Sequence, residues 1–306
     1  MPVTFDDETN LFSGTIAADE TLENFDFGLF GGTIINNGYI TGPLQAANDA
    51  PISVINAFES CILKTTGSSF AISFSGDGPA QITNSYVILG HVGLGSGNDV
   101  IENNDHMQGS LRMGGGSDTL VNRINTLPDD AGTFAGHITG AVRMGDGDDT
   151  VRNSGTLTDV LLEGGDDTYY VDGAAATSRM VAGLEAGVAS AVRGGDGNDE
   201  IVGGLWNDRL FGGADNDLIG GGGGNDQLFG GIGDDTLYGG NDNDRVTGAG
   251  GDDYIAGENG NAVLHLSDLL TADNPYGEVF HGAVLIVLNM AEGDLTEDSF
   301  GGLWIA

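Results

Sequence analysis

The chain has 306 residues, of which 55 are glycine and one is cysteine, and its 46 acidic residues outnumber nine basic ones to give a formal net charge of −37 at pH 7. This balance excludes nucleic-acid binding through a basic surface and attachment to anionic lipid through a polybasic patch. The single cysteine, Cys61, excludes an internal disulfide, and we expect it to be a small buried apolar residue.

Residues 1–91 predict an amino-terminal cap, over residues 1–30, followed by short strands. Segments 34–40, 82–88 and 151–157 contain β-branched runs that are interrupted by Asn-Gly or Asn-Ser. This pattern favours a right-handed parallel β-helix with asparagines stacked at its corners. The alternative is an antiparallel sandwich with hairpins at the same points. Residues 1–7 lack a basic region and an apolar stretch, so we expect no Sec-type signal peptide.

Residues 92–192 contain four glycine-rich turns, each ending in an aspartate that precedes a short strand. These aspartates are Asp99, Asp118, Asp149 and Asp167. The intervals of 19 and 18 residues, from 99 to 118 and from 149 to 167, correspond to one coil of a solenoid. The intervals of 31 and 32 residues, from 118 to 149 and from 167 to 199, predict wider coils or inserted loops. Arg112, Arg143 and Arg193 precede such turns at equivalent positions, which predicts a structural ladder paired with acids.

Seven nonapeptides follow one another without interruption from residue 194 to residue 256. The first position is always Gly, the fifth Asn or Asp, the sixth Asp and the eighth Ile, Leu or Val. Glycine permits a tight turn, and the last three residues form a strand with one inward side chain. Two units therefore make one 18-residue coil, and stacked coils bury the aliphatic residues between two narrow parallel sheets. The sixth-position aspartates are Asp199, Asp208, Asp217, Asp226, Asp235, Asp244 and Asp253.

Stacking of alternate units predicts two columns of aspartate. The odd units contribute Asp199, Asp217, Asp235 and Asp253, and the even units contribute Asp208, Asp226 and Asp244. Because neighbouring coils lie about 4.8 Å apart, these carboxylates repel one another unless a cation lies between them. Carboxylate and carbonyl oxygens with flexible geometry favour Ca²⁺ over Mg²⁺ or zinc. The alternative is a glycine-rich solenoid without metal.

This array resembles the calcium-binding nonapeptide repeat of the RTX (hemolysin-type) family. The resemblance implies a parallel β-roll in which the sixth-position aspartates and turn carbonyls bind Ca²⁺ between units i and i+2. It implies about five ions in residues 193–260, with further ions at Asp99, Asp118, Asp149 and Asp167. Trp206, Asp215 and Asp242 occupy the fourth position, where the family prefers glycine, which predicts strained or weaker turns. Ala262 replaces the next aspartate, so we expect the calcium column to end there.

Residues 261–306 lose the repeat and predict a carboxy-terminal cap. Residues 284–288 indicate a buried strand, and the longest apolar run, 283–288, is too short to span a membrane. Residues 294–300 are similar to the uncleaved secretion signals of RTX proteins that leave bacteria through a type I exporter. The whole chain therefore predicts an all-β fold: a right-handed parallel β-helix that continues into a calcium-binding β-roll with a cap.

The sequence contains neither H-E-x-x-H nor G-x-S-x-G, and its five histidines show no ligand spacing. We therefore expect no enzymatic activity; a β-helix enzyme acting on polysaccharides is the alternative. The expected function is that of a secreted bacterial protein that folds outside the cell on binding Ca²⁺ and self-assembles into a filament, layer or biofilm matrix. A calcium-dependent module for surface polysaccharide is the second interpretation, with Trp206, Phe211, Phe229 and Tyr238 as candidates for stacking on sugars.

Overall fold

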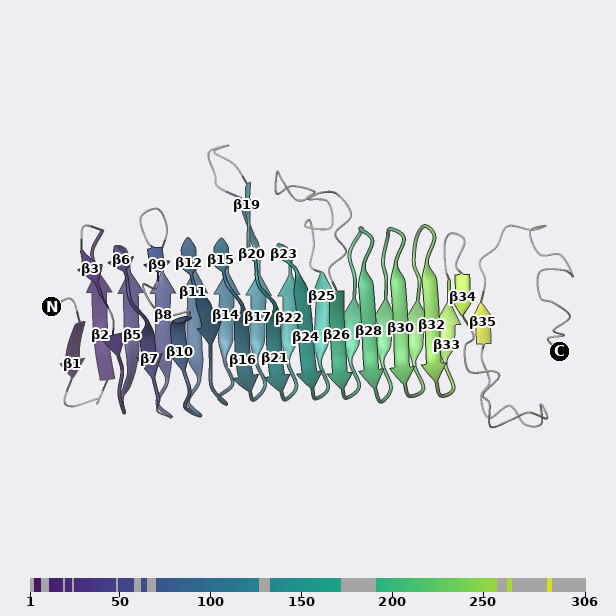
Figure 1. Ribbon diagram of the computed structural model, residues 1–306, viewed down its shortest axis with the longest axis horizontal. Helices are drawn as coiled ribbons and strands as arrows, with labels where there is room; N and C mark the ends of the chain where they lie inside the picture. Colours follow the sequence, from purple (N-terminus) through teal and green to yellow (C-terminus); the bar gives the residue numbers. More distant parts are fainter. Residues whose placement is uncertain are drawn as a thin grey trace, which may run out of the picture.

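Short strands joined by tight turns wind the chain into a long rod in the computed structural model (Figure 1). The structure describes residues 3–6, 11–18, 20–23, 25–47, 49–57, 62–64, 70–126, 133–171, 191–257, 263–265 and 285–287. All regular elements in these residues are β-strands, of two to six residues each. The all-β prediction is thereby confirmed, and none of the described residues forms a helix that could cross a membrane.

Three sheets run along the rod, as far as the described residues define them. The 14-stranded sheet contains β1 (Val3–Asp6), β2 (Leu11–Ile16), β5 (Gly31–Asn36), β8 (Ile52–Asn56), β11 (Ala80–Asn84), β14 (Val100–Asn103), β17 (Thr119–Asn122), β22 (Thr150–Asn153), β25 (Thr168–Val171), β27 (Glu200–Val202), β29 (Leu218–Gly220), β31 (Thr236–Tyr238), β33 (Tyr254–Ala256) and β35 (Leu285–Val287). The 12-stranded sheet contains β4 (Phe25–Asp26), β7 (Leu44–Ala46), β10 (Phe70–Phe74), β13 (His91–Gly93), β16 (Leu111–Gly115), β21 (Val142–Asp146), β24 (Asp159–Gly164), β26 (Ala191–Asp196), β28 (Arg209–Ala214), β30 (Gln227–Ile232), β32 (Arg245–Gly250) and β34 (Val263–His265). The seven-stranded sheet contains β3 (Thr21–Leu22), β6 (Tyr39–Ile40), β9 (Ile62–Lys64), β12 (Val87–Leu89), β15 (His106–Gln108), β20 (His137–Ile138) and β23 (Thr156–Leu157).

Within the three long sheets, the strands from β2 onward pair in parallel with their equivalents in the neighbouring coils. For example, β28 pairs with β26 and with β30, so that Leu210 aligns with Val192 on one side and Leu228 on the other. The antiparallel pairs among the described residues are β1 with β2 and the hairpin of β18 (Ile124–Thr126) with β19 (Thr133–Ala135). A parallel solenoid therefore replaces the sandwich alternative. The first coil already begins at β2, inside the segment predicted as a cap, and only β1 closes the edge in the antiparallel direction.

The aliphatic columns predicted from the eighth position form the core of the repeat array. Ile201, Ile219, Leu237 and Ile255 align in the 14-stranded sheet, each at most 1% exposed. Leu210, Leu228 and Val246 align in the 12-stranded sheet and are buried to the same extent. Burial of one such side chain stabilises a fold by roughly 1.5–3 kcal/mol, but only when both neighbouring coils are in place.

A ladder of asparagines turns the corner between the 14-stranded and seven-stranded sheets, as the Asn-Gly and Asn-Ser segments predict. Each buried side chain donates from Nδ2 to Oδ1 of the next, at 2.8 or 2.9 Å, through Asn36, Asn56, Asn84, Asn103, Asn122 and Asn153. The ladder ends where Asn153 donates to the hydroxyl of Tyr169 at 3.3 Å. The seven-stranded sheet ends at β23, just before this point, so the coils change there from three strands to two.

An insertion accounts for one of the two long intervals between the upstream aspartates. Between Asp118 and Asp149 the chain leaves the stack as the β18–β19 hairpin, and β19 projects from the rod in Figure 1. The coils on either side stay in contact, because β17 pairs directly with β22. Across the second long interval β25 likewise pairs directly with β27, while residues 172–190 lie outside the described residues.

Several predictions fall outside the part of the chain that the structure describes. They are the environment of Cys61, the end of the column at Ala262 and the secretion-signal segment 294–300. Within the predicted cap, β34 extends the 12-stranded sheet and β35 extends the 14-stranded one. The strand expected at 284–288 is therefore present as Leu285–Val287.

Candidate metal centre

The odd-unit aspartates form one continuous ladder with the four upstream aspartates. In each case Oδ1 accepts the main-chain N–H of the aspartate one coil earlier. The donor–acceptor pairs are Asp99 to Asp118, Asp118 to Asp149, Asp149 to Asp167, Asp167 to Asp199, Asp199 to Asp217, Asp217 to Asp235 and Asp235 to Asp253, all at 2.7–3.0 Å. Ala80 donates to Asp99 at 2.7 Å and begins the ladder. The sequence predicted both groups but gave no sign that they share a single row.

The even-unit aspartates form the second predicted row on the opposite edge. Asp208 donates from its main-chain N–H to Oδ1 of Asp226, and Asp226 donates to Asp244, at 2.8 and 2.9 Å. Asp208 differs from the others because its Oδ2 accepts the N–H of Gly204 at 2.8 Å. The structure therefore places all 11 predicted residues in two rows, one on each edge of the roll.

The second carboxylate oxygen is buried without a hydrogen-bond partner in nine of these aspartates. They are Asp99, Asp118, Asp149, Asp167, Asp199, Asp217, Asp226, Asp235 and Asp244. A buried acceptor without a donor costs about 1–3 kcal/mol, and more when it is charged. A row of such atoms is a reason to expect a bound cation.

The first-position glycines carry no Cβ and so let these oxygens lie close to the main chain. A Cβ on any of these seven glycines would come too close to Oδ2 of the aspartate in its own unit. At Gly212 the conflict is with Asp217, and the carbonyl oxygen of Gly230, one coil later, is also only 2.7 Å from the Cβ position. The same carbonyl of the next coil approaches in the other units up to Gly239. Glycine is therefore required here by the approach of two oxygens.

The upstream turns lack this glycine. The positions that align with Gly194 along the 12-stranded sheet are Leu94, Met113, Met144 and Leu162. All four side chains are buried, and none is more than 8% exposed. The upstream aspartates thus join the hydrogen-bonded ladder, while a buried hydrocarbon side chain stands where the strict array has glycine.

The fifth position has its own ladder, which explains why it is always Asn or Asp. Its Oδ1 accepts the N–H of the fifth residue one coil later, as Asn216 does from Asp234 at 2.7 Å. The same bond links Asn207 to Asn225 and Asn225 to Asn243 on the other edge. Two departures from fourth-position glycine, Asp215 and Asp242, adopt φ of 76°, in the left-handed region that disfavours side chains. The strain predicted for these two turns is present, while Trp206 is not among the residues of positive φ.

Burial raises the pKa of the ladder aspartates above the ordinary value of 3.8. The pKa rises to about 6 for Asp99, Asp149, Asp199 and Asp208, to about 7 for Asp217, Asp226 and Asp235, and to about 8 for Asp118 and Asp167. The pKa of Asp244 is raised for the same reason. Loss of hydration is the main cause, opposed by the accepted N–H bond, and neighbouring carboxylates add to it for Asp217, Asp226 and Asp235. A divalent cation would favour the charged form.

Side chains alone do not complete a metal site in the described residues, where no three His, Cys, Asp or Glu side chains form a group that could hold an ion. Main-chain oxygens must therefore supply most of the ligands. This donor set, one carboxylate with glycine carbonyls around it, suits Ca²⁺ and does not suit zinc. The residues of the strict array thus fit calcium, whereas the upstream turns lack the glycine that lets these oxygens approach one another.

Comparison with known families agrees with this geometry. The model of the RTX calcium-binding nonapeptide repeat, which spans four copies, matches residues 193–228 and again residues 229–264. Residues 193–264 of this chain are RTX repeats. The second match extends into the unit that contains Ala262, whereas the turns at Asp99, Asp118, Asp149 and Asp167 lie outside both matches. No curated protein and no solved structure matches the chain.

The three arginines of the predicted ladder share one column, but in the described residues only Arg143 of the three pairs with an acid. Arg112 aligns with Arg143, and Leu161 stands between Arg143 and Arg193. Arg143 pairs with Glu163 at 2.7 Å, as expected for a ladder paired with acids. Arg193 instead lies over the ring of Phe211, with its guanidinium carbon 5.2 Å from the ring centroid.

Proposed function

We propose that this protein is a secreted calcium-binding structural protein that folds on binding Ca²⁺ outside the cell and then self-assembles. The nine buried, unpartnered Oδ2 atoms in the two aspartate rows carry the calcium part of the proposal. RTX repeats are typical of secreted proteins, and export through a type I exporter belongs to the proposal. An unfolded chain can be threaded through an exporter. Because free calcium is scarce in the cytosol, repulsion between the aspartates of neighbouring coils would keep the chain unfolded there.

Calcium binding is large enough to decide whether the chain folds. A site with a Kd of about 0.1 mM gains roughly 1.4 kcal/mol at millimolar calcium. About five such sites supply ~7 kcal/mol, which is comparable with the whole stability of an ordinary domain. Circular dichroism with calcium and after chelation tests this. At pH 8 we expect the β signal to appear only with calcium, and a β-rich spectrum that survives chelation unchanged at this pH would contradict the proposal.

An exposed apolar patch at the first coil supports self-assembly. Phe5, Leu11, Leu29 and Phe30 are 38%, 38%, 79% and 37% exposed, and we call these four residues the amino-terminal patch. The ring of Phe5 packs at 4.8 Å from Phe30 and 4.9 Å from Phe12, which continues into the buried core at Phe27. Exposed apolar residues that are grouped in this way are typical of contact surfaces.

The amino-terminal patch lies where the stack of coils ends. In the described residues β3 and β4 each pair on one side only, with β6 and β7. Unpaired strand edges accept further strands, and another copy of the chain presents strands of matching spacing. The proposed product is therefore a filament of rods joined through their ends.

Substitution of the amino-terminal patch tests the assembly. We expect Leu29→Asp with Phe30→Asp to leave calcium-dependent folding intact and to abolish filaments in electron micrographs taken in millimolar calcium. Leu205→Asp, which changes a 49% exposed leucine in a turn of the repeat array, is the control and should assemble normally. Monomers of the unaltered protein at all concentrations in calcium would overturn the assembly proposal.

The second interpretation, binding of surface polysaccharide through aromatic stacking, gains little from these contacts. Phe211 and Phe229 stack on each other, with 5.0 Å between centroids and 5° between planes, so their adjoining faces are not open to sugars. Arg193 lies over Phe211 as well. Trp206, which is 51% exposed, and Tyr238, whose ring is tilted against Tyr254 at 5.8 Å, remain as candidates. We propose no catalytic activity for the chain.

A further inference from the structure

Five of the nine basic residues of this acidic chain lie on the outer face of one sheet. They alternate with buried residues along the strands of the 12-stranded sheet, so their side chains share its solvent side. All five are exposed: Arg112, Arg143, Arg193, Arg209 and Arg245. We call these residues the basic face. Arg209 and Arg245 stand in one column, through Gln227, and the other three stand in the neighbouring column.

The arginines of the basic face are not neutralised within the repeat array. Among the described residues, ion pairs join Arg143 to Glu163 and Arg123 to Glu102. Arg193 and Arg209 instead lie over the ring of Phe211, at 5.2 and 5.8 Å from its centroid. Such contacts hold a guanidinium in place and leave its N–H donors available to a carboxylate.

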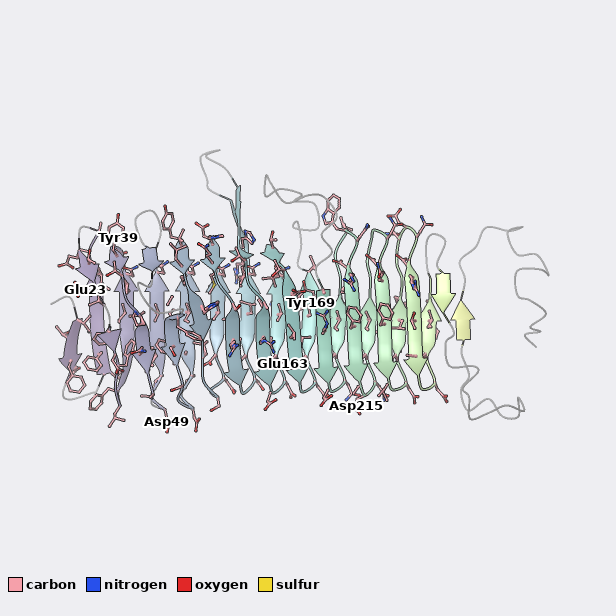
Figure 2. The ribbon with its side chains drawn as sticks, viewed as in Figure 1. Glu23, Tyr39, Asp49, Glu163, Tyr169 and Asp215 are labelled. Carbon is pink, nitrogen blue, oxygen red and sulfur yellow. The ribbon has the colours of Figure 1, made fainter. Side chains whose placement is uncertain are left out.

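An exposed row of aspartates runs along the edge where the 12-stranded sheet turns into the 14-stranded one. Every turn on this edge from β21 to β33 contributes at least one exposed carboxylate. The row consists of Asp146, Asp148, Asp166, Asp196, Asp215, Asp234 and Asp252, and we call it the acidic ridge. In Figure 2 the labelled Asp49 and Asp215 project from the same long edge of the rod.

The basic face and the acidic ridge repeat with the same period, because both are set by the spacing of coils, about 4.8 Å. Arg209 and Arg245 are separated by two coils, from β28 through β30 to β32. Asp146 and Asp196 are also separated by two coils, from β21 through β24 to β26. A ridge laid along a face in register therefore brings opposite charges together at several points.

We propose that the basic face of one molecule binds the acidic ridge of a second copy, so that rods associate side by side. The two surfaces differ, so the contact is heterologous and can continue into a layer. Single exposed ion pairs contribute little, and the contact depends on several pairs that act together along the rod. It should therefore weaken steeply as salt increases. The inference rests on the proposed self-assembly and adds a second, lateral contact that is independent of the amino-terminal patch.

A charge exchange with matched spacing tests the lateral contact. The face variant is Arg209→Glu with Arg245→Glu, and the ridge variant is Asp146→Lys with Asp196→Lys. Both are made in the Leu29→Asp, Phe30→Asp background, so that the end contact does not contribute. Neither set touches a residue of the aspartate rows, and calcium-induced circular dichroism verifies that each variant folds. Glu200→Lys, an exposed acid on the other sheet, is the control for altered charge.

Sedimentation velocity in millimolar calcium at low salt gives the outcome. The parent is the Leu29→Asp, Phe30→Asp protein. We expect the parent and its Glu200→Lys control to associate. The face variant alone and the ridge variant alone should each need a protein concentration at least about tenfold higher to reach the same degree of association. A mixture of the two variants should associate again, because the unaltered face of one meets the unaltered ridge of the other. Association of the face variant equal to that of the parent, or a mixture that stays monomeric, would overturn the proposal.

Two further outcomes distinguish the lateral contact from the end-to-end filament and from polysaccharide binding. If the parent associates laterally while the unaltered protein forms no end-to-end filaments, the lateral contact stands and the filament proposal fails. If the parent stays monomeric but co-sediments with a soluble polyuronate, and the face variant does not, the basic face serves an acidic polysaccharide and the second-copy proposal is wrong.

Discussion

Asn153 donates a hydrogen bond of 3.3 Å from its side-chain amide to the hydroxyl of Tyr169, and this contact ends the asparagine ladder. Tyr169 occupies the core column between Val151 and Ile201, where other coils carry an aliphatic residue. Its hydroxyl thus satisfies the last asparagine at the level where three-stranded coils give way to two-stranded ones. Burial raises the pKa of Tyr169 to about 12, so the hydroxyl stays protonated at physiological pH.

Tyr169→Phe should destabilise the calcium-bound protein by about 1–3 kcal/mol, because the buried amide of Asn153 loses its acceptor. Denaturant unfolding in saturating calcium measures the free energy. Tyr170→Phe is the matched control, since that ring lies on the outer face near Arg152 and its loss of hydroxyl should change little. Equal effects of the two substitutions would argue against a special role for Tyr169.

Gly212→Ala should weaken calcium binding in the repeat array. The added Cβ would overlap Oδ2 of Asp217 and approach the carbonyl oxygen of Gly230, two of the oxygens beside the expected ion. Calcium titration followed by circular dichroism should show a higher midpoint. Gly220→Ala is the control, because no atom lies within 4 Å of its Cβ position, and a shift as large as that of Gly212→Ala would contradict the assignment.

Asp217→Asn should lower the number of bound calcium ions more than Asp118→Asn does. Oδ2 of Asp217 lies against Gly212, beside the carbonyl oxygen of Gly230, whereas the turn of Asp118 carries the buried Met113 at the position equivalent to Gly212. Both substitutions keep Oδ1 as an acceptor in the ladder, so folding should be affected similarly. Equilibrium dialysis with radioactive calcium counts the ions. An equal loss at both positions would show that the upstream turns bind calcium as the strict array does.

The calcium-free protein should be more folded at pH 5 than at pH 8. The pKa of the ladder aspartates in the fold lies at about 6 to 8, above the unfolded value near 3.9. Between these values the folded state holds more protons than the unfolded state, so its stability falls as pH rises. Circular dichroism in a chelator across this range measures the effect. Asp217→Asn with Asp235→Asn should flatten the profile, and a β signal that grows with pH would refute the expectation.

The sequence by itself determined the repeat unit. A strict nine-residue period with glycine, aspartate and an aliphatic residue at fixed positions allows one local solution, a turn followed by a three-residue strand. The odd and even rows, the buried column from Ile201 to Ile255 and the preference for calcium all follow from that period and from oxygen chemistry. The asparagine corners could also be predicted, because Asn-Gly and Asn-Ser interrupt β-branched runs at recurrent places.

Only the tertiary structure decided which distant turns share a row. Asp118 and Asp149 are neighbours in space because the chain between them leaves as a hairpin, and an interval of 31 residues does not distinguish a hairpin from a wider coil. The roles of Tyr169, of the fifth-position ladder and of Met113 against Gly212 likewise depend on the coil above or below. In a solenoid, each side chain meets its partner one coil away. The nine-residue period therefore determines the local structure of the repeat, whereas the register in which the coils stack determines which residues form a site.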